Sequence, residues 1–167
     1  MPRDWIVVVC LFLSTLAGSG TLAAEPAAKE QWPKDELPAA DGSRASIHSL
    51  RGEKGILVVS LSVDCPIANG YSPTLERLAK LYAKQGIAFV GLHSNAGHGL
   101  KEIEKHRREF GLTFAILKDP GAACASKLGL TVSPEVCLLD AAGAIRYRGR
   151  IDDRYQNRGA APREAQS

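Results

Sequence analysis

The residue most able to do chemistry is a cysteine placed where a buried strand gives way to a helix. Cys65 follows the apolar run of residues 55–62, GILVVSLS, and is followed directly by Pro66. Proline is favoured in the first turn of a helix, because its missing N–H needs no partner there. Cys65 is therefore predicted at a helix N-terminus, where free N–H groups and the helix dipole favour a thiolate, although the neighbouring Asp64 opposes it. Since the thiolate attacks disulfides and peroxides, Cys65 is predicted to be a redox nucleophile.

Alternating strand-like and helix-like segments must position this cysteine. Continuous apolar runs predict buried strands, and apolar residues at three- and four-residue spacing predict helices. The predicted elements are a short hairpin or strand within residues 39–52, strands at 55–62, 87–92 and 113–117, helices at 72–85, 100–110 and 121–128, and two closing strands at 135–139 and 144–147. Strands that alternate with helices indicate an α/β fold, and the closing pair of strands makes its sheet mixed.

The first 24 residues have the layout of a secretory signal peptide. Arg3 precedes an apolar run over residues 6–17, and small residues end at Ala23 and Ala24. The run is shorter than the about 20 apolar residues of a membrane span, and an uncleaved anchor is the alternative. We therefore expect an exported, periplasmic protein that contacts a membrane only through this segment if it is retained.

The rest of the chain divides by composition. Residues 25–38, rich in alanine, proline and charge, are predicted to be a linker, residues 39–155 the folded domain and residues 156–167 a disordered tail. The net charge of +3 is too small to indicate nucleic-acid binding, and the late arginines alternate with acidic residues as on a solvated face. Without the signal segment three cysteines are left, an odd number, so at least one thiol is free, modified or paired with another chain.

Four segments resemble the thioredoxin-like superfamily, on the redoxin side that includes periplasmic thiol-disulfide reductases and peroxiredoxins. The stretch ADGSRASIHSLRGEKGILVVSLSVDCP is similar to the redoxin segment that leads through a short hairpin into the strand before the cysteine. Pro73 stands where thioredoxins carry a proline that bends the active-site helix. ILKDPGAACASKLGL and TVSPEVCLLDAAGAIRYRGRID resemble the second half, with Pro134 at the position of a cis-proline. The resemblance covers residues 37–153.

The resemblance implies a fold and an activity. The fold is thioredoxin-like, a mixed central sheet flanked by helices with a short N-terminal β extension. The activity is thiol-based oxidoreduction of protein or small-molecule thiols and disulfides, with peroxide as a further candidate oxidant and no cofactor. Cys65 would be the nucleophile, the Ser62 hydroxyl would stabilise its thiolate, and Pro134 would shape the substrate groove.

The sequence departs from both groups of relatives near the cysteine. Dithiol reductases carry C-x-x-C, and here Ala68 occupies the place of the second cysteine, so a local disulfide cannot form. Peroxiredoxins carry P-x-x-x-T-x-x-C and a distant arginine. Val58 replaces that proline, Ser62 replaces the threonine, and the segment that would carry the arginine has Pro134. These replacements weaken the prediction of peroxidase activity.

An oxidised Cys65 needs a second thiol to be reduced again. Cys137, three residues after Pro134 on a predicted strand, and Cys124, on a predicted helix of small residues, are the two candidates within the chain. Burial in the core is the alternative for each of them, because a free cysteine behaves as a small apolar residue. An external thiol is the remaining route.

Hypotheses from other classes stay open. A copper-binding, metallochaperone-like protein would use C-x-x-x-C and a histidine; Asn69 stands at the second position, although His93 and His98 flank a loop nearby. Histidines at the surface, or with their hydrogen bonds satisfied inside the fold, are the simpler interpretation, so no metal ligand is predicted. A silent interaction module of the same fold would leave Cys65 no more reactive than a peptide thiol. The family often adds a helix after the closing strands, which the polar end of this chain does not resemble, so we expect an exposed sheet face or one covered by a partner.

Overall fold

The apolar segment before Cys65 forms the central strand of a mixed sheet. In the computed structural model, which describes residues 32–154, β3 (Gly55–Ser60) runs parallel to β4 (Ile87–His93) and antiparallel to β6 (Glu135–Asp140). β5 (Ala115–Lys118) and β7 (Ile145–Gly149) complete a five-stranded sheet of order β5-β4-β3-β6-β7. A central strand covered on both faces needs apolar residues at every position, which explains the unbroken apolar run of β3. The predicted mixed central sheet is confirmed.

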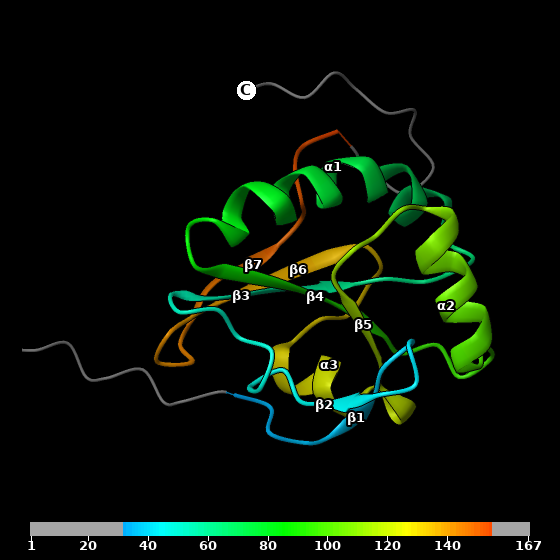
Figure 1. Cartoon of the computed structure of the whole chain (residues 1–167), viewed down its shortest axis with the longest axis horizontal. Helices are drawn as coiled ribbons and strands as arrows, with labels where there is room; N and C mark the ends of the chain where they lie inside the picture. Colours follow the sequence, from blue (N-terminus) through cyan, green and yellow to red (C-terminus); the bar gives the residue numbers. More distant parts are fainter. Residues whose placement is uncertain (1–31, 155–167) are drawn as a thin grey trace, which may run out of the picture.

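Helices and a hairpin cover the two faces of this sheet (Figure 1). α1 (Pro66–Ala83) and α2 (Leu100–Glu109) pack on one face. α3 (Ala123–Leu128) packs on the other, together with the antiparallel pair β1 (Leu37–Pro38) and β2 (Arg44–Ala45). A 3₁₀ turn, η1 (Pro120–Ala122), leads into α3. The predicted order of strands and helices and the short N-terminal β extension are confirmed, and α1 begins at Pro66.

The alternation of side chains along the strands creates two separate apolar clusters. Val59 of β3 belongs with Leu75 of α1 to one cluster, which we call the α1 face. Val58, the preceding residue, belongs with Leu128 to the other, which we call the α3 face. Neighbouring residues of a strand point to opposite faces of the sheet. Odd- and even-numbered positions of one strand therefore contribute to different clusters.

The ordered fold begins earlier than the sequence predicts. Residues 32–38 were predicted as part of a linker, but Trp32 is only 8% exposed and belongs to the cluster of the α3 face. Its ring lies against Gly143 in the turn between β6 and β7, where a Cβ atom would stand 2.4 Å from the indole. The linker prediction is therefore wrong for residues 32–38, because a large aromatic side chain fills a space that a glycine leaves open.

The predicted signal peptide (residues 1–24) and the predicted tail (156–167) lie outside the described residues, as does the first part of the predicted linker. Within residues 32–154, none of the helices combines the length and apolar character needed to cross a membrane.

The segment after β7 is fixed to α1 by a polar cluster. The Tyr71 hydroxyl donates to Asp152, whose carboxylate also pairs with Arg154 at 2.7 Å. The Arg154 guanidinium lies 4.3 Å from the centre of the Tyr71 ring, within cation–π range. Burial and the Asp152 charge raise the pKa of Tyr71, so it stays a neutral donor. These contacts hold the segment after β7 against the α1 face. An apolar pocket of about 300 Å³ lies there between α1 and the sheet.

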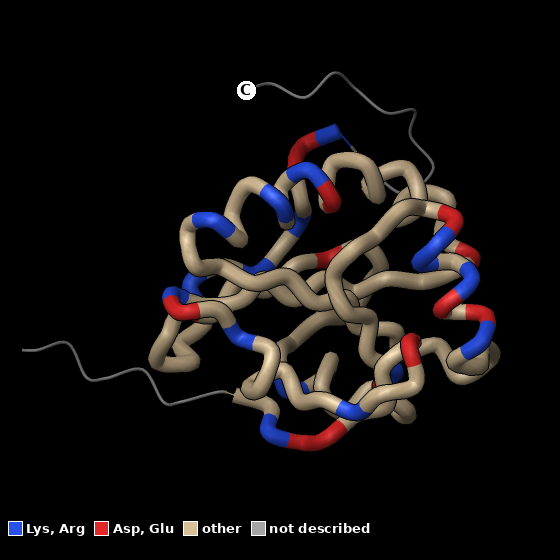
Figure 2. Tube along the Cα trace, in the orientation of Figure 1, with Lys and Arg blue, Asp and Glu red and all other residues tan. Residues whose placement is uncertain are grey.

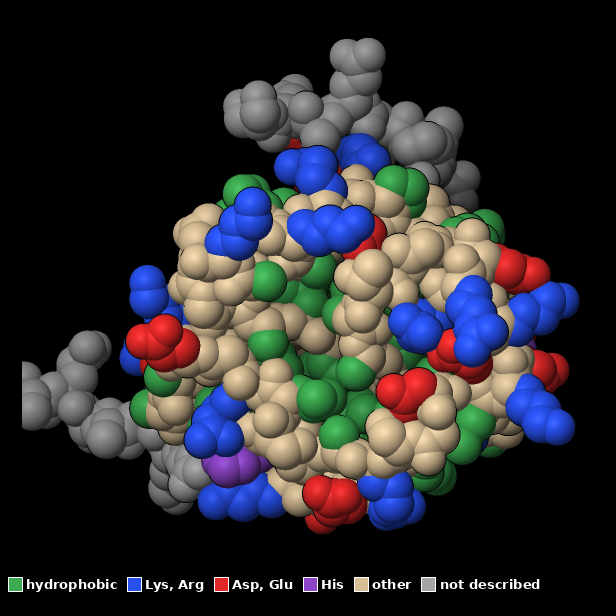
Figure 3. Space-filling model, viewed as in Figure 1, with side chains coloured by type: hydrophobic (Ala, Val, Ile, Leu, Met, Phe, Trp, Pro, Cys, Tyr) green, Lys and Arg blue, Asp and Glu red, His purple; other side chains and the backbone are tan. Residues whose placement is uncertain are grey.

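Charged side chains of both signs are interspersed over the surface. Figure 2 shows them along α2, on the turns and in the closing segment, and Figure 3 shows hydrophobic side chains reaching the surface between them. Arg146 pairs with Asp140 at 2.6 Å, as Arg154 does with Asp152. Two of the late arginines, Arg146 and Arg154, are thus paired with carboxylates, as on a mixed-charge surface.

Candidate active site

Cys65 caps the N-terminus of α1. Its backbone is extended, with φ −88° and ψ 105°, and the Ala68 N–H donates to its Sγ at 3.4 Å. Its carbonyl accepts the Asn69 N–H at 3.0 Å, which begins the helical hydrogen-bond pattern. Pro66 has no N–H, so the helix has one free donor fewer at this end, and the Cys65 sulfur satisfies the Ala68 N–H. A hydrogen bond from a backbone amide stabilises a negative sulfur, so this contact favours the thiolate.

A second contact of the same sulfur works in the opposite direction. The Cys65 thiol donates to the Ser133 carbonyl at 3.3 Å. The Ser133–Pro134 peptide bond is cis, as predicted for Pro134. A carbonyl oxygen can accept a proton from the thiol but carries the same sign of partial charge as a thiolate. The half-buried sulfur therefore has two backbone partners: the Ala68 N–H favours the thiolate and the Ser133 carbonyl favours the thiol.

Two side chains outside the cysteine hold the loop in front of it. The Asn69 amide donates to the Val63 carbonyl at 3.0 Å, and its oxygen lies 2.7 Å from Nε2 of His106 on α2. On the other side of Val63, its N–H donates to Nε2 of His93, the last residue of β4, at 3.5 Å. We call Asn69, His93 and His106 the loop clamp. It connects the loop to β4 and α2, which fixes the position of Cys65 relative to the sheet.

The contact of the clamp with His93 depends on a neutral imidazole, whereas His106 donates to the Asn69 oxygen. Burial, and then the charges of His98 and Lys118, lower the pKa of His93 to about 4. Burial also lowers the pKa of His106. A neutral His93 can accept at Nε2, whereas an imidazolium donates at both nitrogens. The hydrogen bond to the Val63 N–H is therefore available at neutral pH and lost when His93 is protonated.

His98 makes a polar contact beside the cysteine. Its Nε2 lies 3.0 Å from the carboxylate of Asp64, and its ring meets that of His93 edge to face, with 5.2 Å between the ring centres. The Asp64 carboxylate, predicted to repel a thiolate at Cys65, thus has the His98 imidazole as a partner. Within residues 32–154 the structure holds no group of three or more histidine, cysteine, aspartate or glutamate side chains placed to bind a metal ion.

The structure brings two of the other predicted residues to Cys65. Ser62 is linked to it through the backbone, since the Cys65 N–H donates to the Ser62 carbonyl at 3.1 Å. Pro134 follows the carbonyl that accepts the thiol proton. The Ser133 hydroxyl donates to the Ser60 carbonyl at 3.2 Å, which ties the Pro134 loop to the end of β3.

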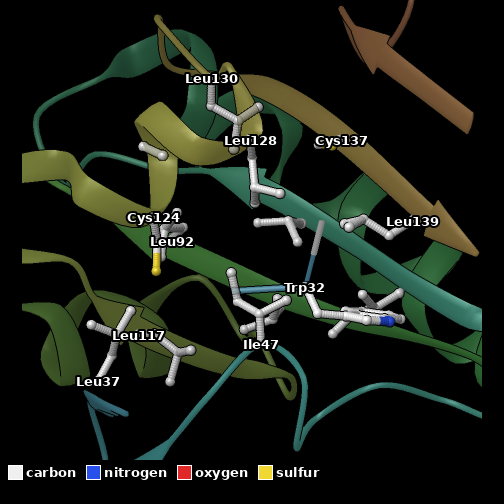
Figure 4. Packing of buried hydrophobic residues seen from close by; sticks show 14 of the residues in the cluster. Trp32, Leu37, Ile47, Leu92, Leu117, Cys124, Leu128, Leu130, Cys137 and Leu139 are labelled. Carbon is white, nitrogen blue, oxygen red and sulfur yellow. The ribbon is translucent and has the colours of Figure 1, made fainter. Parts of the chain in front are cut away.

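The two candidate resolving cysteines lie on the opposite side of the sheet. Cys124 is 1% exposed and Cys137 is 0% exposed, and both belong to the cluster of the α3 face (Figure 4). Cys65 packs against the cluster of the α1 face. Burial raises the pKa of both thiols to about 11, and Asp119 contributes at Cys124. The three cysteines within residues 32–154 are free, and the sheet separates the two buried thiols from the half-buried Cys65.

Sequence reasoning did not find the loop clamp. In the sequence, Asn69 stands at the place of a second cysteine, and no motif includes His106. A signal was present for His106, which follows Ile103 at helical spacing on the buried side of α2. For Asn69 no local signal exists, because its role depends on a partner 37 residues away in the sequence.

Comparisons with known proteins agree with this geometry. The model of the family described as Redoxin matches residues 26–161. The thiol-disulfide oxidoreductase ResA of Geobacillus thermodenitrificans is 26% identical over 106 residues, which cover 64% of this chain. The chain spans 59% of the length of that relative.

Solved structures share the fold. An uncharacterized conserved protein from Geobacillus kaustophilus superposes with a TM-score of 0.71 at 24% identity, covering 81% of this chain and 74% of that one. A secreted Mycobacterium tuberculosis disulfide oxidoreductase homologous to E. coli DsbE gives a TM-score of 0.62 at 21% identity, covering 80% and 90%. These likenesses establish the thioredoxin-like fold that the sequence predicts.

Proposed function

The chain belongs to the redoxin family, and we propose that within it the protein is a thiol oxidoreductase that works with one cysteine, Cys65. The observation that carries the proposal is the position of the Cys65 sulfur at the N-terminus of α1, where the Ala68 N–H donates to it at 3.4 Å. The relative from Geobacillus thermodenitrificans carries the name of a thiol-disulfide oxidoreductase, which supports disulfides as the substrate class.

The reaction begins with attack of the Cys65 thiolate on one sulfur of a disulfide R–S–S–R′. The bond between the two substrate sulfurs breaks as the bond between Cys65 and the attacked sulfur forms, and R′–S⁻ leaves with the electron pair and takes a proton from solvent. The amide of Ala68 stabilises the negative sulfur before the attack. The Ser133 carbonyl loses its donor when the Cys65 thiol is deprotonated, and the mixed disulfide, which has no S–H, does not restore it.

An external thiol completes the cycle in this proposal. A thiolate R″–S⁻ attacks the substrate sulfur of the mixed disulfide, so R–S–S–R″ is released and Cys65 returns as a thiolate. Three features support an external thiol. Ala68 occupies the position of a local resolving cysteine, and Cys124 and Cys137 are buried on the α3 face, with thiol pKa values raised to about 11.

We propose that the protein works outside the cytoplasm, on the basis of the signal-like pattern of residues 1–24. We also propose disulfides rather than peroxides as its oxidants. Val58 and Pro134 stand where the peroxiredoxin pattern has a proline and an arginine, and Ser62 meets Cys65 through its backbone. The groups that would orient a peroxide are therefore not supplied by these positions.

The test is the reaction of the reduced protein with 2,2′-dithiodipyridine, whose released thiopyridone is coloured. We expect folded protein to react at least about tenfold faster at pH 7 than a synthetic peptide of residues 60–70, because the peptide lacks the helix N-terminus. Peptide mapping by mass spectrometry should place the mixed disulfide on Cys65, and added cysteine should restore the thiol.

The Cys65→Ser variant should lose the fast phase, and Cys124→Ala should keep it. A folded protein that reacts no faster than the peptide would exclude the proposed activity and favour a silent interaction module.

A further inference from the structure

A pocket of about 220 Å³ with a mixed polar and apolar lining lies near Cys65, between the ends of β3 and β4, the start of α3 and the loop before Pro134. Ser133, whose carbonyl accepts the Cys65 thiol, contributes to its wall, so the pocket and the Cys65 sulfur share this residue as a neighbour. We call it the acceptor pocket. Its polar lining residues are Ser60, Ser62, Ser94, Asn95, Thr131 and Ser133.

Three hydroxyl groups of this lining have an acceptor within the protein. The Ser94 hydroxyl donates to the Asp119 carboxylate at 3.1 Å, and the Thr131 hydroxyl contacts the Glu135 carboxylate at 3.5 Å. The Ser133 hydroxyl donates to the Ser60 carbonyl at 3.2 Å. Carboxylates and carbonyls only accept, so in each pair the hydroxyl is the donor. What each hydroxyl can still offer a ligand is its oxygen lone pairs.

The charges behind this wall are mainly negative. The carboxylate of Asp119 is fully buried and also accepts the N–H groups of Cys124 and Ala125, which fixes it below the pocket. The carboxylate of Glu135 is held by the Thr131 N–H at 2.7 Å. Lys118 is a cation near the pocket, and its ammonium donates to the Asn95 and His98 carbonyls.

Asn95 differs from the other polar residues of the lining. Its side-chain oxygen accepts the Gly97 N–H at 2.9 Å, so its amide keeps donors free. Asn95 is exposed, however, whereas Ser94 and Ser133 are half-buried. The oxygens of Ser94, Thr131 and Ser133 therefore give the pocket a group of acceptors next to two carboxylates, while residues such as Leu61 and Leu130 supply an apolar part of the wall.

We propose that the acceptor pocket binds a nitrogen that donates hydrogen bonds, such as a protonated amine or an amide N–H, carried by the substrate close to its sulfur. The proposal rests on the function proposed for Cys65 and specifies its substrate class. In the first step, the nitrogen of R occupies the pocket while the Cys65 thiolate attacks the sulfur of R–S–S–R and the second R–S⁻ leaves and is protonated. Acceptors and carboxylates stabilise an N–H donor and repel an anionic group at the same position.

The experiment compares three symmetric disulfides that differ at the group next to sulfur. Cystamine carries an ammonium, N,N′-diacetylcystamine carries an amide N–H, and bis(2-methoxyethyl) disulfide carries no donor. Each rate with the reduced protein is divided by the rate of the peptide of residues 60–70 with the same disulfide, because the disulfides differ in intrinsic reactivity. We expect this ratio to be about tenfold or more higher for cystamine than for the methoxy compound.

The amide compound identifies the source of the nitrogen. A ratio that approaches that of cystamine indicates that a neutral N–H, as in a peptide, is sufficient, whereas a ratio well below it indicates a small amine. Equal ratios for all three disulfides, all above one, would overturn the proposal and leave the function of Cys65 intact. Ratios near one throughout would instead contradict the function itself.

A pair of matched variants tests the pocket directly. Thr131→Val removes one acceptor of the exposed loop, and we expect the ratio for cystamine to fall about threefold or more, while that for the methoxy compound is unchanged. Thr113→Val is the control, because Thr113 also pairs its hydroxyl with a carboxylate, that of Glu76 at 2.8 Å, but does not line the pocket. An equal loss in both variants, or no loss in Thr131→Val, would contradict the assignment of the pocket.

Discussion

The two faces of the sheet hold the same functional group in opposite environments. On the α1 face, the Cys65 sulfur meets a backbone N–H at 3.4 Å and a carbonyl at 3.3 Å, at the half-buried end of a helix. On the α3 face, Cys124 and Cys137 are enclosed by apolar side chains, and burial raises the pKa of each thiol to about 11. The contrast predicts that the reactivity of each cysteine in this fold depends on the face of the sheet on which its thiol lies.

The largest expected difference between the faces is in the rate of alkylation. We expect N-ethylmaleimide to modify Cys65 at least about 1,000-fold faster than Cys124 or Cys137 in the folded protein, because reaching the buried thiols requires opening of the core, which costs several kcal/mol. Quenched time points analysed by peptide mapping give the three rates in one experiment. Comparable rates for Cys65 and either buried cysteine would remove the distinction between the faces.

The second prediction brings another thiol to the α1 face. Ala68 is 1% exposed and its N–H already contacts the Cys65 sulfur, so Ala68→Cys places a thiol next to the mixed disulfide. We expect that mixed disulfide to decay at least about 100-fold faster in the variant without added thiol, because an intramolecular attack has a high effective concentration. Ala79→Cys, also on the buried side of α1 but more than three turns from Cys65, is the control and should leave the decay unchanged.

A third prediction concerns the stability supplied by the buried thiols. Cys137→Ser places a hydroxyl among apolar side chains at a position with no exposure, which we expect to cost about 1–3 kcal/mol of the free energy of unfolding. Cys65→Ser, at the half-buried helix N-terminus where serine is a good capping residue, should change it by less than about 1 kcal/mol. Urea denaturation of both variants measures this difference, and a reversed order would show that the α3 face is not the more closely packed.

The smallest expected effect is the pH dependence contributed by the loop clamp. The pKa of His93 is about 4 in the folded protein, below the 6.5 of an ordinary histidine, so the unfolded chain takes up the proton first as the pH falls. The stabilisation is complete above about pH 6.5 and is lost progressively towards pH 4. At about 1.4 kcal/mol per pH unit, His93 accounts for up to about 2 kcal/mol between pH 7 and pH 5.

Urea denaturation at those two pH values provides the measurement. The difference between pH 7 and pH 5 should be smaller in His93→Gln than in the parent protein, and His48→Gln, near the hairpin, is the control. If His93→Gln showed the parent's pH dependence, the neutral imidazole would not be part of the clamp.

Local patterns account for what the sequence predicts correctly. Three features depend only on neighbouring residues. They are the unbroken apolar run of β3, the position of Pro66 after Cys65, and the side of its strand on which Cys137 lies. Their placement therefore follows from periodicity and from the geometry of a helix N-terminus. The cis bond before Pro134 came from a resemblance rather than from local physics.

Contacts between distant segments account for what the sequence does not predict. Asn69 becomes a clamp only because α2 brings His106 within 2.7 Å. The sequence around Trp32 is typical of a linker, and the space for its ring is provided by the turn at Gly143, far along the chain. The proton directions of Ser94 and Thr131 likewise depend on Asp119 and Glu135, which the chain supplies from other elements.

The burial of Trp32 gives the protein an optical probe of one face. The sequence has two tryptophans, and Trp32 is the one within the described residues. Its indole lies in the cluster of the α3 face, 5.7 Å from the His48 ring and under the guanidinium of Arg51. Its fluorescence should respond to melting of the α3 face and to displacement of residues 32–38, while remaining insensitive to the oxidation state of Cys65 on the other side of the sheet. Emission and thiol chemistry can thus be followed together as independent signals from the two faces.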